Sequence, residues 1–447
     1  MKTIAVDFGE GRGPVRPLHG VNNGPIGYGS LVDVSHHYRD LGVPYVRLHD
    51  PNWPHPREVD IPQVFPDPEA DPDDPASYRF GPTDDYLRRI RETGAGIVYR
   101  LGVSIEHTPI KYYTHPPADF ERWARVCAGI VRHYNHGWAD GFEWGIRYWE
   151  IWNEPDIGDK MWSGTFEQYL ELYQATAPVL KALDPDLKVG GYAAANPRSE
   201  RVGQFLRYCR QHRLPLDFFS WHTYTDDPER LVQNAGRVRE QLDAHGYSAA
   251  ESHLNEWNYV GFDWGQIWQP GNEAMRREAF AAQKNQPGAS FCAAALIALQ
   301  EASVDVACYY DGQPLALFCG LFDYYGVPTL TYRAFAWFRR ALDCGEKVGV
   351  TLVEEDDANV KLYALAAFEP ERGAGAILLS HPGARAESVD VMLHGLPPGG
   401  SWGWRACRLE QAGPVEPQQF SRLSPEGQPL HVMLEPHAVV LIEVRGR

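Results

Sequence analysis

The stretch YWEIWNEPD, residues 148–156, decides the fold that this sequence predicts. Its first five residues are mostly large and apolar, as in a strand buried on both faces. Asn153, Glu154 and Pro155 then end the strand, because proline lacks the N–H that a central strand needs. A carboxylate is costly to bury unless it is paired or protonated. Glu154 therefore either caps the next helix, pairs with an arginine, or does chemistry at a strand end.

Seven further apolar runs lie before and after this strand, and helical patterns separate them. Eight strands, each followed by a helix, is the count of a (β/α)8 TIM barrel, so we predict an α/β fold with the barrel at residues 15–340. The eight strand-like runs are residues 17–22, 43–49, 96–101, 147–152, 187–191, 217–222, 252–257 and 304–310. The helical patterns are residues 83–94, which open with a Thr and Asp pair suited to an N-cap, 117–134, 165–183, 199–213, 228–245 and 287–302.

The sequence pattern changes at about residue 345, where short extended runs alternate with turns rich in Gly, Pro and acidic residues. No helix-length pattern intervenes. This pattern is typical of an antiparallel β-domain. We predict an accessory antiparallel β-sandwich formed by residues 345–447 together with residues 1–10, whose strand at 3–8 precedes the barrel and pairs with this sheet. One of the expected strands covers residues 360–366.

A Pro- and Asp-rich segment, residues 65–85, interrupts the alternation of strands and helices after the second strand. Its aspartates lack the glycine and the terminal glutamate of an EF-hand calcium loop, so we expect no metal there. We predict instead a long, stiff loop on the face that carries the active site of a barrel.

A second glutamate ends a strand further along the chain, in the stretch HLNEWN, residues 253–258. Glu256 follows Glu154 by 256 − 154 = 102 residues, which is the length of three further strand–helix units. Glu154 would therefore close the fourth strand and Glu256 the seventh. Those strands lie on opposite sides of a barrel, so the two carboxylates would face each other across its mouth.

Two facing carboxylates in an aromatic-lined mouth indicate cleavage of a glycosidic bond. One carboxyl group must stay protonated to protonate the leaving oxygen, and the other must stay ionised. A separation of about 5–5.5 Å predicts retention of configuration and about 6.5–9.5 Å predicts inversion. The 14 tryptophans and 23 tyrosines are also typical of sugar-binding clefts, although packing alone explains such numbers in many proteins.

The composition excludes several classes of function. The formal net charge of −17 repels phosphate backbones and anionic lipid surfaces, so neither nucleic acid nor a membrane is an expected partner. The first ten residues carry no long apolar segment, and we expect no signal peptide. Seven cysteines without a CxxC pair suit reduced thiols in the cytoplasm. The motifs HExxH and GxSxG and a phosphate-binding loop are missing, so we expect no metal and no cofactor.

These motifs together resemble the clan of (β/α)8 retaining glycosidases, in which an Asn-Glu-Pro acid/base ends strand four and a nucleophilic glutamate ends strand seven. Within the clan the sequence is similar to glycoside hydrolase family 39, the family of β-xylosidases and α-L-iduronidases. The stretches WEIWNEP at 149–155 and EWN at 256–258 carry the likeness, as do DFFSWHTY at 217–224, GLFD at 320–323 and TYRAF at 331–335.

The resemblance implies a role for each matching residue. Glu154 would be the general acid/base and Glu256 the nucleophile of a double displacement. Asn153 would hydrogen-bond the 2-hydroxyl of the sugar. The further residues implied around the sugar and the nucleophile are His49, His222 and Tyr224, with Arg47 bracing the carboxylates from below.

The sequence departs from the family in strand eight, where xylosidases carry a tryptophan and then an acidic pair. Here Tyr310 stands in place of the tryptophan, and Gly312 and Gln313 replace the acidic pair. Trp264 and Trp268, in the long loop after strand seven, are alternative sugar platforms. We therefore expect terminal pentosides first, with L-arabinosides and xylosides hard to separate, and uronides and hexosides after them.

Two other functions stay open at this point. An endo-acting glycanase of the same clan would have an open groove and release products from mid-chain. A non-catalytic carbohydrate-binding barrel would keep the aromatic cleft without turnover. The sequence also leaves open whether the chain forms a homo-oligomer.

Overall fold

Eight parallel strands close into a barrel, which confirms the predicted fold class. The computed structural model describes residues 2–27, 29–52, 57–314, 317–353, 361–398, 400–423 and 428–446. Around the barrel the order of neighbouring strands is β10-β11-β2-β5-β6-β7-β8-β9, with every pairing parallel. Their bounds are β2 Gly20–Asn22, β5 Tyr45–Arg47, β6 Gly96–Leu101, β7 Tyr148–Ile151, β8 Lys188–Ala194, β9 Phe218–Thr225, β10 Glu251–Tyr259 and β11 Val306–Tyr309.

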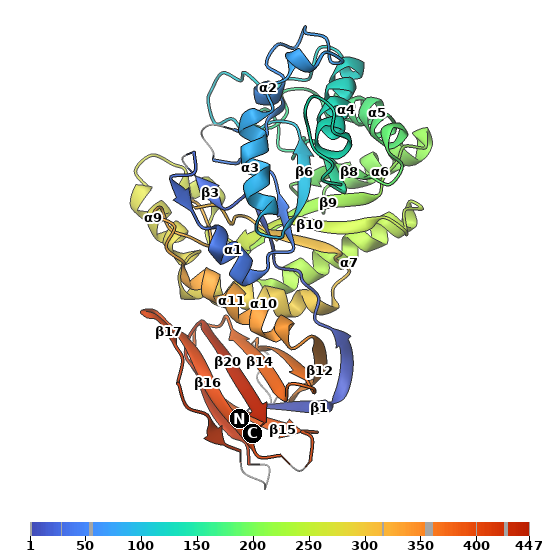
Figure 1. Ribbon diagram of the computed structural model, residues 1–447. Coiled ribbons are helices and arrows are strands. Elements are labelled where there is room, and N and C mark those ends of the chain that lie inside the picture. The colour runs from blue at the N-terminus through green and yellow to red at the C-terminus, as the bar shows by residue number, and fades with distance from the viewer. Residues whose placement is uncertain are drawn as a thin grey trace.

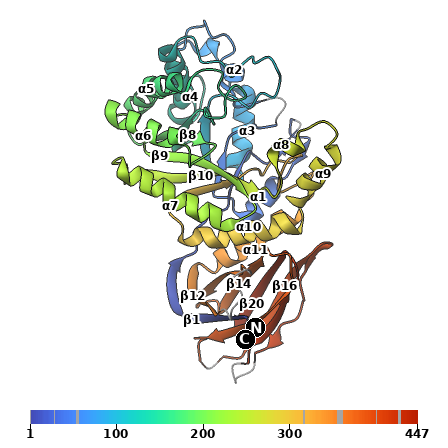
Figure 2. The same ribbon diagram turned by 180° about the vertical axis from the view of Figure 1, so that it is seen from behind.

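Helices follow the barrel strands and cover their outer faces (Figure 1). The longer ones are α1 Ser35–Leu41, α3 Gly81–Arg91, α4 Phe120–His136, α5 Phe166–Leu183, α6 Glu200–His212, α7 Pro228–Ala244, α9 Glu273–Ala282, α10 Gln286–Ala298 and α11 Leu330–Asp343. Two four-residue helices, α2 Ile61–Val64 and α8 Trp264–Ile267, lie in the loops after β5 and β10, and β3 Ile26–Gly27 pairs with β4 Val32–Asp33. Figure 2 shows α8 and α9 together at one edge of the barrel.

Side-chain caps explain where most of these helices begin. At α5, Thr165 accepts from the backbone N–H of Gln168 while the Gln168 side chain accepts from the N–H of Thr165, a complete capping box. The cap predicted for residues 83–94 is wrong. Helix α3 begins at Gly81, two residues earlier, and the Thr83 hydroxyl donates instead to the carbonyl of Glu58 in the preceding loop. The proline at position N1 or N2 favours the earlier start.

A ten-stranded sheet lies beside the barrel in the order β17-β16-β20-β14-β13-β12-β1-β15-β19, with β18 paired to β16. The path folds over one hydrophobic core, so its two ends face each other as in a sandwich. Its strands are β1 Lys2–Pro14, β12 Glu346–Val353, β13 Tyr363–Glu369, β14 Ala374–His381, β15 Glu387–His394, β16 Trp402–Glu410, β17 Gly413–Val415, β18 Ser421–Arg422, β19 Leu430–Leu434 and β20 Ala438–Gly446. Residue 360, where a strand was expected to begin, lies outside the described residues.

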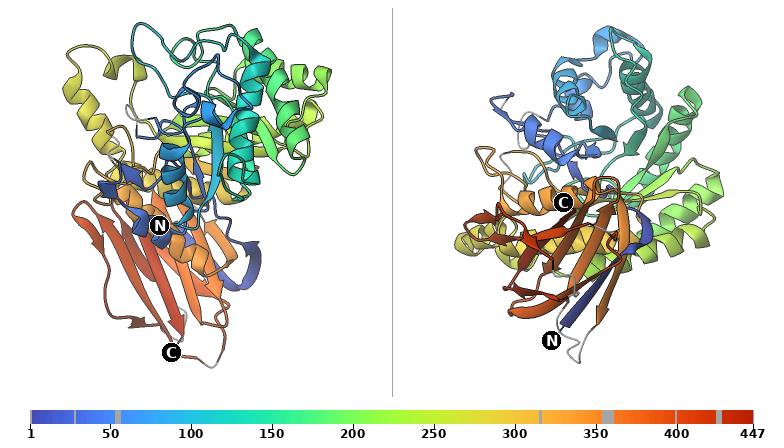
Figure 3. Two further views of the ribbon diagram at one scale, coloured as in Figure 1. Left: turned by 45° about the horizontal axis from the view of Figure 1, so that its top comes forward. Right: turned by 60° about the horizontal axis from the view of Figure 1, so that its bottom comes forward.

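The strand β1 joins this sheet from the other end of the chain, as the blue strand among orange and red ones in Figure 3. It pairs antiparallel with β12 and parallel with β15. The expectation of a wholly antiparallel sheet is therefore wrong at this one pairing. The physical reason is that β1 and β15 are not consecutive in sequence, so no hairpin forces them to run in opposite directions.

Helices α10 and α11 lie between the barrel and the sheet (Figure 1). The Ser380 hydroxyl on β14 donates to the carbonyl of Ser290 in α10 at 2.7 Å. On α11, Trp337 Nε1 and Arg340 both donate to the carboxylate of Glu416, just after β17. Buried polar bonds of this kind add directional contacts to the apolar packing between the two parts.

The Pro- and Asp-rich segment is partly regular. Residues 75–77 form a short 3-10 helix, Pro75–Ser77, and the segment's last residues already belong to α3. Arg122 on α4 donates to the carbonyls of Glu69 and Ala70, at 2.8 Å each, and Arg132 donates to Asp73. These bonds hold the segment against α4. Among the described residues no helix is long and apolar enough to cross a membrane.

Candidate active site

Glu154 lies directly beyond β7, where the backbone leaves the extended conformation. Trp152 has φ +69° and Glu154 has φ +44°, both in the left-handed region that side chains with a Cβ rarely adopt. Trp152 is held there by burial and by the bond from its Nε1 to the carbonyl of Met161, at 2.9 Å. Strained backbone of this kind clusters at functional sites.

Glu256 lies within β10, and a bulge in that strand aims its side chain. Leu254 pairs with Trp221 on β9, but Glu256 pairs with the next residue, His222, so Asn255 is the extra residue. Regular alternation would send Asn255 and Glu256 to opposite faces. With the bulge, both side chains contact groups inside the barrel: Asn255 donates to Glu150, and Glu256 accepts from Arg47.

The two glutamates meet across the mouth of the barrel. One carboxylate oxygen of Glu154 and one of Glu256 lie within 4.8 Å of each other, with His222 Nδ1 in the same cluster. The Glu154 side chain is 14% exposed and that of Glu256 is 5% exposed. Both carboxyl groups can therefore reach one bound atom from a largely dry environment.

The surroundings of Glu256 favour its ionised form more than those of Glu154. Glu256 Oε1 accepts from Arg47 NH1 at 2.7 Å, and Oε2 accepts from the Tyr224 hydroxyl at 2.7 Å. Burial raises the pKa of Glu256, while the Arg47 charge and the Tyr224 hydrogen bond oppose that rise. A carboxylate held by a cation and a hydroxyl donor keeps one oriented lone pair for attack.

Glu154 is the group that keeps its proton at neutral pH. Burial, with a further contribution from Asp156, raises the pKa of Glu154 to about 8, against the opposing effect of Arg47. Its Oε1 lies 2.7 Å from His222 Nδ1. Two carboxyl groups with different surroundings supply the acid and the base that glycoside cleavage needs.

His222 stands between the two glutamates as a neutral donor. Its Nδ1 lies 2.7 Å from Glu154 and 3.4 Å from Glu256, a geometry that favours the Nδ1–H tautomer. Burial lowers the pKa of His222 to about 4, so the ring is uncharged at neutral pH. A neutral His222 orients both carboxyl groups without adding charge.

Asn153 and His49 lie on the Arg47 side of the pair. Asn153 Oδ1 accepts from Arg47 NH2 at 2.6 Å, and its Nδ2 lies 3.1 Å from His49 Nε2. Both side chains are buried, and His49 Nδ1 has no partner among the described residues. The structure thus brings these two predicted sugar contacts together beside the acid/base candidate.

Tyr310 and Gln313, two residues at which the sequence differs from the family pattern, both form hydrogen bonds with neighbouring loops. The Tyr310 hydroxyl donates to Asp50 Oδ2 at 3.2 Å. Gln313 Nε2 donates to Asp311 and to the Asp50 carbonyl, and its Oε1 accepts from the N–H of Asn52. The Gln313 amide therefore joins two loops.

The two predicted tryptophan platforms have different positions. Trp264 meets the Tyr224 ring edge-on, with centroids 6.1 Å apart, and is 41% exposed. Trp268 is 52% exposed and contacts Phe280 and Arg276. Phe318, which the sequence reasoning missed, lies between Tyr224, Trp264 and Tyr310 with centroids 5.4–6.4 Å away.

Glu154, His222 and Glu256 are also the described residues that a metal ion could reach together. The same atoms already hydrogen-bond one another or Tyr224 and Arg47. This arrangement suits a carboxylic acid and a carboxylate acting on one substrate, and the sequence predicts no metal.

Other members of the site were missed in the sequence for a common reason. Each is a polar residue inside or at the end of a barrel strand, where apolar residues are expected, and that signal could have identified them. They are Asn22 at the end of β2, Glu150 in β7 and Asn255 in β10.

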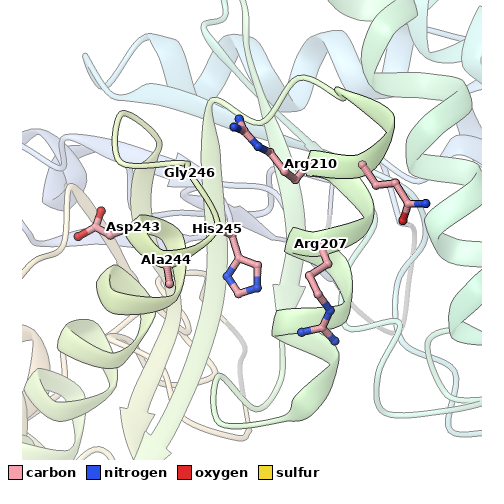
Figure 4. Close-up of a pocket in the computed structure, with 7 residues that line it drawn as sticks. Arg207, Arg210, Asp243, Ala244, His245 and Gly246 are labelled. Carbon is pink, nitrogen blue, oxygen red and sulfur yellow. The ribbon is translucent and has the colours of Figure 1, made fainter.

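A surface hollow lies away from this site, at the ends of α6 and α7 (Figure 4). Arg207 and Arg210 line it from α6, and Asp243, Ala244, His245 and Gly246 from the end of α7. These helix ends lead into the next strands, so the hollow opens at the end of the barrel opposite the carboxylates. Barrel enzymes place their chemistry at the other end.

Comparison with known proteins shows that about half of the chain is similar to one family. The profile of Glycosyl hydrolases family 39 matches residues 35–251. A β-xylosidase of Geobacillus stearothermophilus is 29% identical over 163 residues, which cover 32% of this chain and 32% of that protein. A β-xylosidase of Caldicellulosiruptor saccharolyticus is 34% identical over 114 residues, covering 25% and 22%. The matched stretches thus span a third or less of these curated relatives.

One solved structure resembles the whole chain. The crystal structure of a glucosidase from Croceicoccus marinus superposes with a TM-score of 0.80 and 27% sequence identity, and the match covers 100% of this chain and 99% of that one. The likeness therefore includes both the barrel and the C-terminal sheet.

Proposed function

We propose that this chain, whose residues 35–251 match the profile of Glycosyl hydrolases family 39, is a retaining glycosidase that removes terminal pentosyl residues, such as β-xylosides or L-arabinosides, from small glycosides or oligosaccharides. One observation carries the proposal: carboxylate oxygens of Glu154 and Glu256 lie within 4.8 Å of each other, close to the separation used for retention. The two β-xylosidases among its relatives support a pentosyl substrate.

The geometry supports the following steps of a double displacement. Protonated Glu154 gives its proton to the glycosidic oxygen as the ionised Glu256 attacks the anomeric carbon and forms a glycosyl–enzyme bond. Glu154, now ionised, takes a proton from the water that cleaves this bond. Asn153 would bond the sugar's 2-hydroxyl, and the bonds from Arg47 and Tyr224 to Glu256 support its role as the nucleophile. His49 and Tyr310 complete the rim around the sugar.

The pH dependence of kcat/KM should be bell-shaped with an alkaline limb near pH 8. Glu154 must be protonated, and its pKa is raised to about 8, so activity falls as pH rises through that value. Glu256 must be ionised, and its pKa is raised, so activity falls again as pH drops toward the acid side.

A matched pair of variants tests the alkaline limb. Asp156 raises the pKa of Glu154, so Asp156→Asn should move the limb to lower pH, by about one pKa unit. Asp159→Asn, at a 68% exposed side chain in the same loop, should leave it in place. An alkaline limb that stays unchanged in Asp156→Asn would contradict Glu154 as the titrating acid.

Trp264 and Trp268 provide a second matched pair. Because Trp264 packs on Tyr224, Trp264→Ala should raise KM roughly tenfold with little change in kcat, as expected for a lost stacking contact of about 1.4 kcal/mol. Trp268→Ala should leave KM near the wild-type value, since Trp268 contacts Phe280 and Arg276. The measurement is steady-state kinetics on one aryl glycoside, and equal KM values for both variants would remove Trp264 from the sugar site.

The decisive experiment is hydrolysis of a panel of aryl glycosides, with the configuration of the first-formed sugar followed by NMR. The panel contains β-xylosides, α-L-arabinofuranosides and β-glucosides. Release of a pentose with retained configuration supports the proposal. Preferred release of glucose would favour the second candidate, a glucosidase, which the full-length likeness to the Croceicoccus marinus enzyme supports.

The remaining outcomes separate the other functions. Products released from mid-chain of a xylan would indicate an endo-acting glycanase. Oligosaccharide binding without any release would indicate a carbohydrate-binding barrel. Inverted products would exclude the double displacement.

We also propose a setting for this activity. All seven cysteines are buried and unpaired, which supports a reducing cytoplasm. Carbohydrate is the proposed partner. We propose further that residues 15–340 carry catalysis and that residues 345–447 with 1–10 form the accessory unit.

A further inference from the structure

A third carboxylate lies one layer below the two catalytic candidates. Glu150 on β7 is fully buried in the barrel interior. Its Oε2 accepts from Arg47 Nε at 2.7 Å and lies 2.7 Å from Arg47 NH2. Its Oε1 accepts from Asn255 Nδ2. Both oxygens are therefore engaged, and neither faces the sugar site.

Arg47 divides its five N–H groups between Glu150 and the catalytic layer. Below, Nε and NH2 contact Glu150. Above, NH1 donates to Glu256 at 2.7 Å and to Asn22 at 3.1 Å, and NH2 donates to Asn153 at 2.6 Å. A planar guanidinium whose donors are all hydrogen-bonded has one orientation. Glu150 therefore fixes the orientation of the Arg47 guanidinium, which in turn holds Glu256 and Asn153.

We propose that Glu150 is a positioning residue that shares the Arg47 charge with the nucleophile Glu256 and thereby sets the orientation and basicity of that nucleophile. The inference rests on the proposed glycosidase function. Two anions flank one cation in a dry interior, so each weakens the pull of the cation on the other. A nucleophile paired with an unshared arginine would be less basic and would attack more slowly.

The other groups around Glu256 come from three further elements and stay constant when Glu150 changes. They are His222 and Tyr224 on β9, Glu154 after β7 and Tyr310 after β11. The groups beside Glu150 besides Arg47 are His222, Asn255, Cys308 and Tyr169. Burial lowers the pKa of His222 to about 4 and raises the pKa of both Cys308 and Tyr169, so these three side chains stay neutral at neutral pH.

The Glu150→Gln variant removes the charge and keeps the shape. The Gln oxygen can still accept from Arg47, and its amide can donate to Asn255 Oδ1 once the Asn255 amide turns over, because Oδ1 has no partner among the described residues. We expect the bell-shaped kcat/KM profile to move to lower pH by about one pKa unit. We also expect kcat/KM at the optimum to fall by about 10- to 100-fold on a slow-leaving aryl glycoside.

Two further variants separate charge from geometry and from general damage. Glu150→Asp keeps the charge but shortens the reach to Arg47, so it should lower kcat at every pH without moving the limbs. Glu251→Gln alters another carboxylate of the barrel, bonded to Tyr148 and His253 at the far end of β10, and should change neither limb nor kcat. Thermal unfolding of each variant gives the folded fraction.

The outcomes are distinct. A Glu150→Gln profile that overlays the wild type, with kcat/KM within twofold, overturns the proposal, as does loss of thermal stability alone. Should Glu150→Gln fail to fold, wild-type kcat in folded Glu150→Asp would overturn it equally. Absence of any turnover by the wild type would instead reject the glycosidase function itself.

Discussion

Glu256→Ala is expected to abolish turnover, with a loss in kcat on the order of 10⁴-fold or more on every aryl glycoside. Glu256 is the proposed nucleophile, and alanine leaves no atom to form the glycosyl–enzyme bond. The fold should survive, because Arg47 keeps its contacts with Glu150, Asn22 and Asn153 in the absence of Glu256. Stopped assays on the purified variant, with the thermal unfolding midpoint as a control, give the measurement.

The space left in Glu256→Ala supplies a sharper test. A small anion such as azide can occupy it and attack a substrate whose sugar is positioned by the remaining residues. The product should be a glycosyl azide of inverted configuration, because only one displacement occurs. Rescue to a product of retained configuration would contradict Glu256 as the nucleophile.

Glu154→Ala is expected to affect substrates according to their leaving groups. The leaving group of a natural glycoside is an alkoxide, which needs a proton from Glu154. For such substrates kcat/KM should therefore fall by about 10²–10⁴-fold. The dinitrophenolate of a dinitrophenyl glycoside leaves without protonation. Formation of the glycosyl–enzyme from this substrate should therefore be nearly as fast as in the wild type. The alkaline limb near pH 8 should also disappear, because Glu154 is the group whose raised pKa produces it.

Azide separates the roles of the two glutamates. In Glu154→Ala it takes the place of the water that attacks the glycosyl–enzyme bond, since it needs no general base. Its product should therefore have retained configuration, the opposite of that from Glu256→Ala. Equal losses on natural and activated substrates would remove Glu154 from the acid/base role.

The fold could be predicted from the sequence because each barrel strand is a compact apolar run. All eight predicted runs overlap an observed strand, and the run at residues 96–101 matches β6 at both ends. The spacing of 102 residues also placed Glu154 and Glu256 on opposite strands. Periodicity suffices for such features, since they depend on local burial repeated along the chain.

The finer geometry of the site could not be predicted, because it depends on contacts between distant segments. The bulge at Asn255 follows from pairing with β9 and has no local signal. The left-handed backbone at Glu154 is likewise imposed by its surroundings. The sequence pattern predicted Glu150 only as part of an apolar strand. Its charge inside that strand was the one signal of the buried network around Arg47.

The embedding of β1 between β12 and β15 has a consequence for how the molecule is made. Residues 2–14 leave the ribosome before the barrel does, yet their pairing partners begin at residue 346 and are synthesised some 20–70 s later, at roughly 5–20 residues per second. During that interval Ile4, Val6 and Phe8 have no sheet to join. The barrel strands, which lie between β1 and β12 in the sequence, can already assemble. Completion of the sheet is thus a late event, in which a segment made before the barrel joins strands made after it.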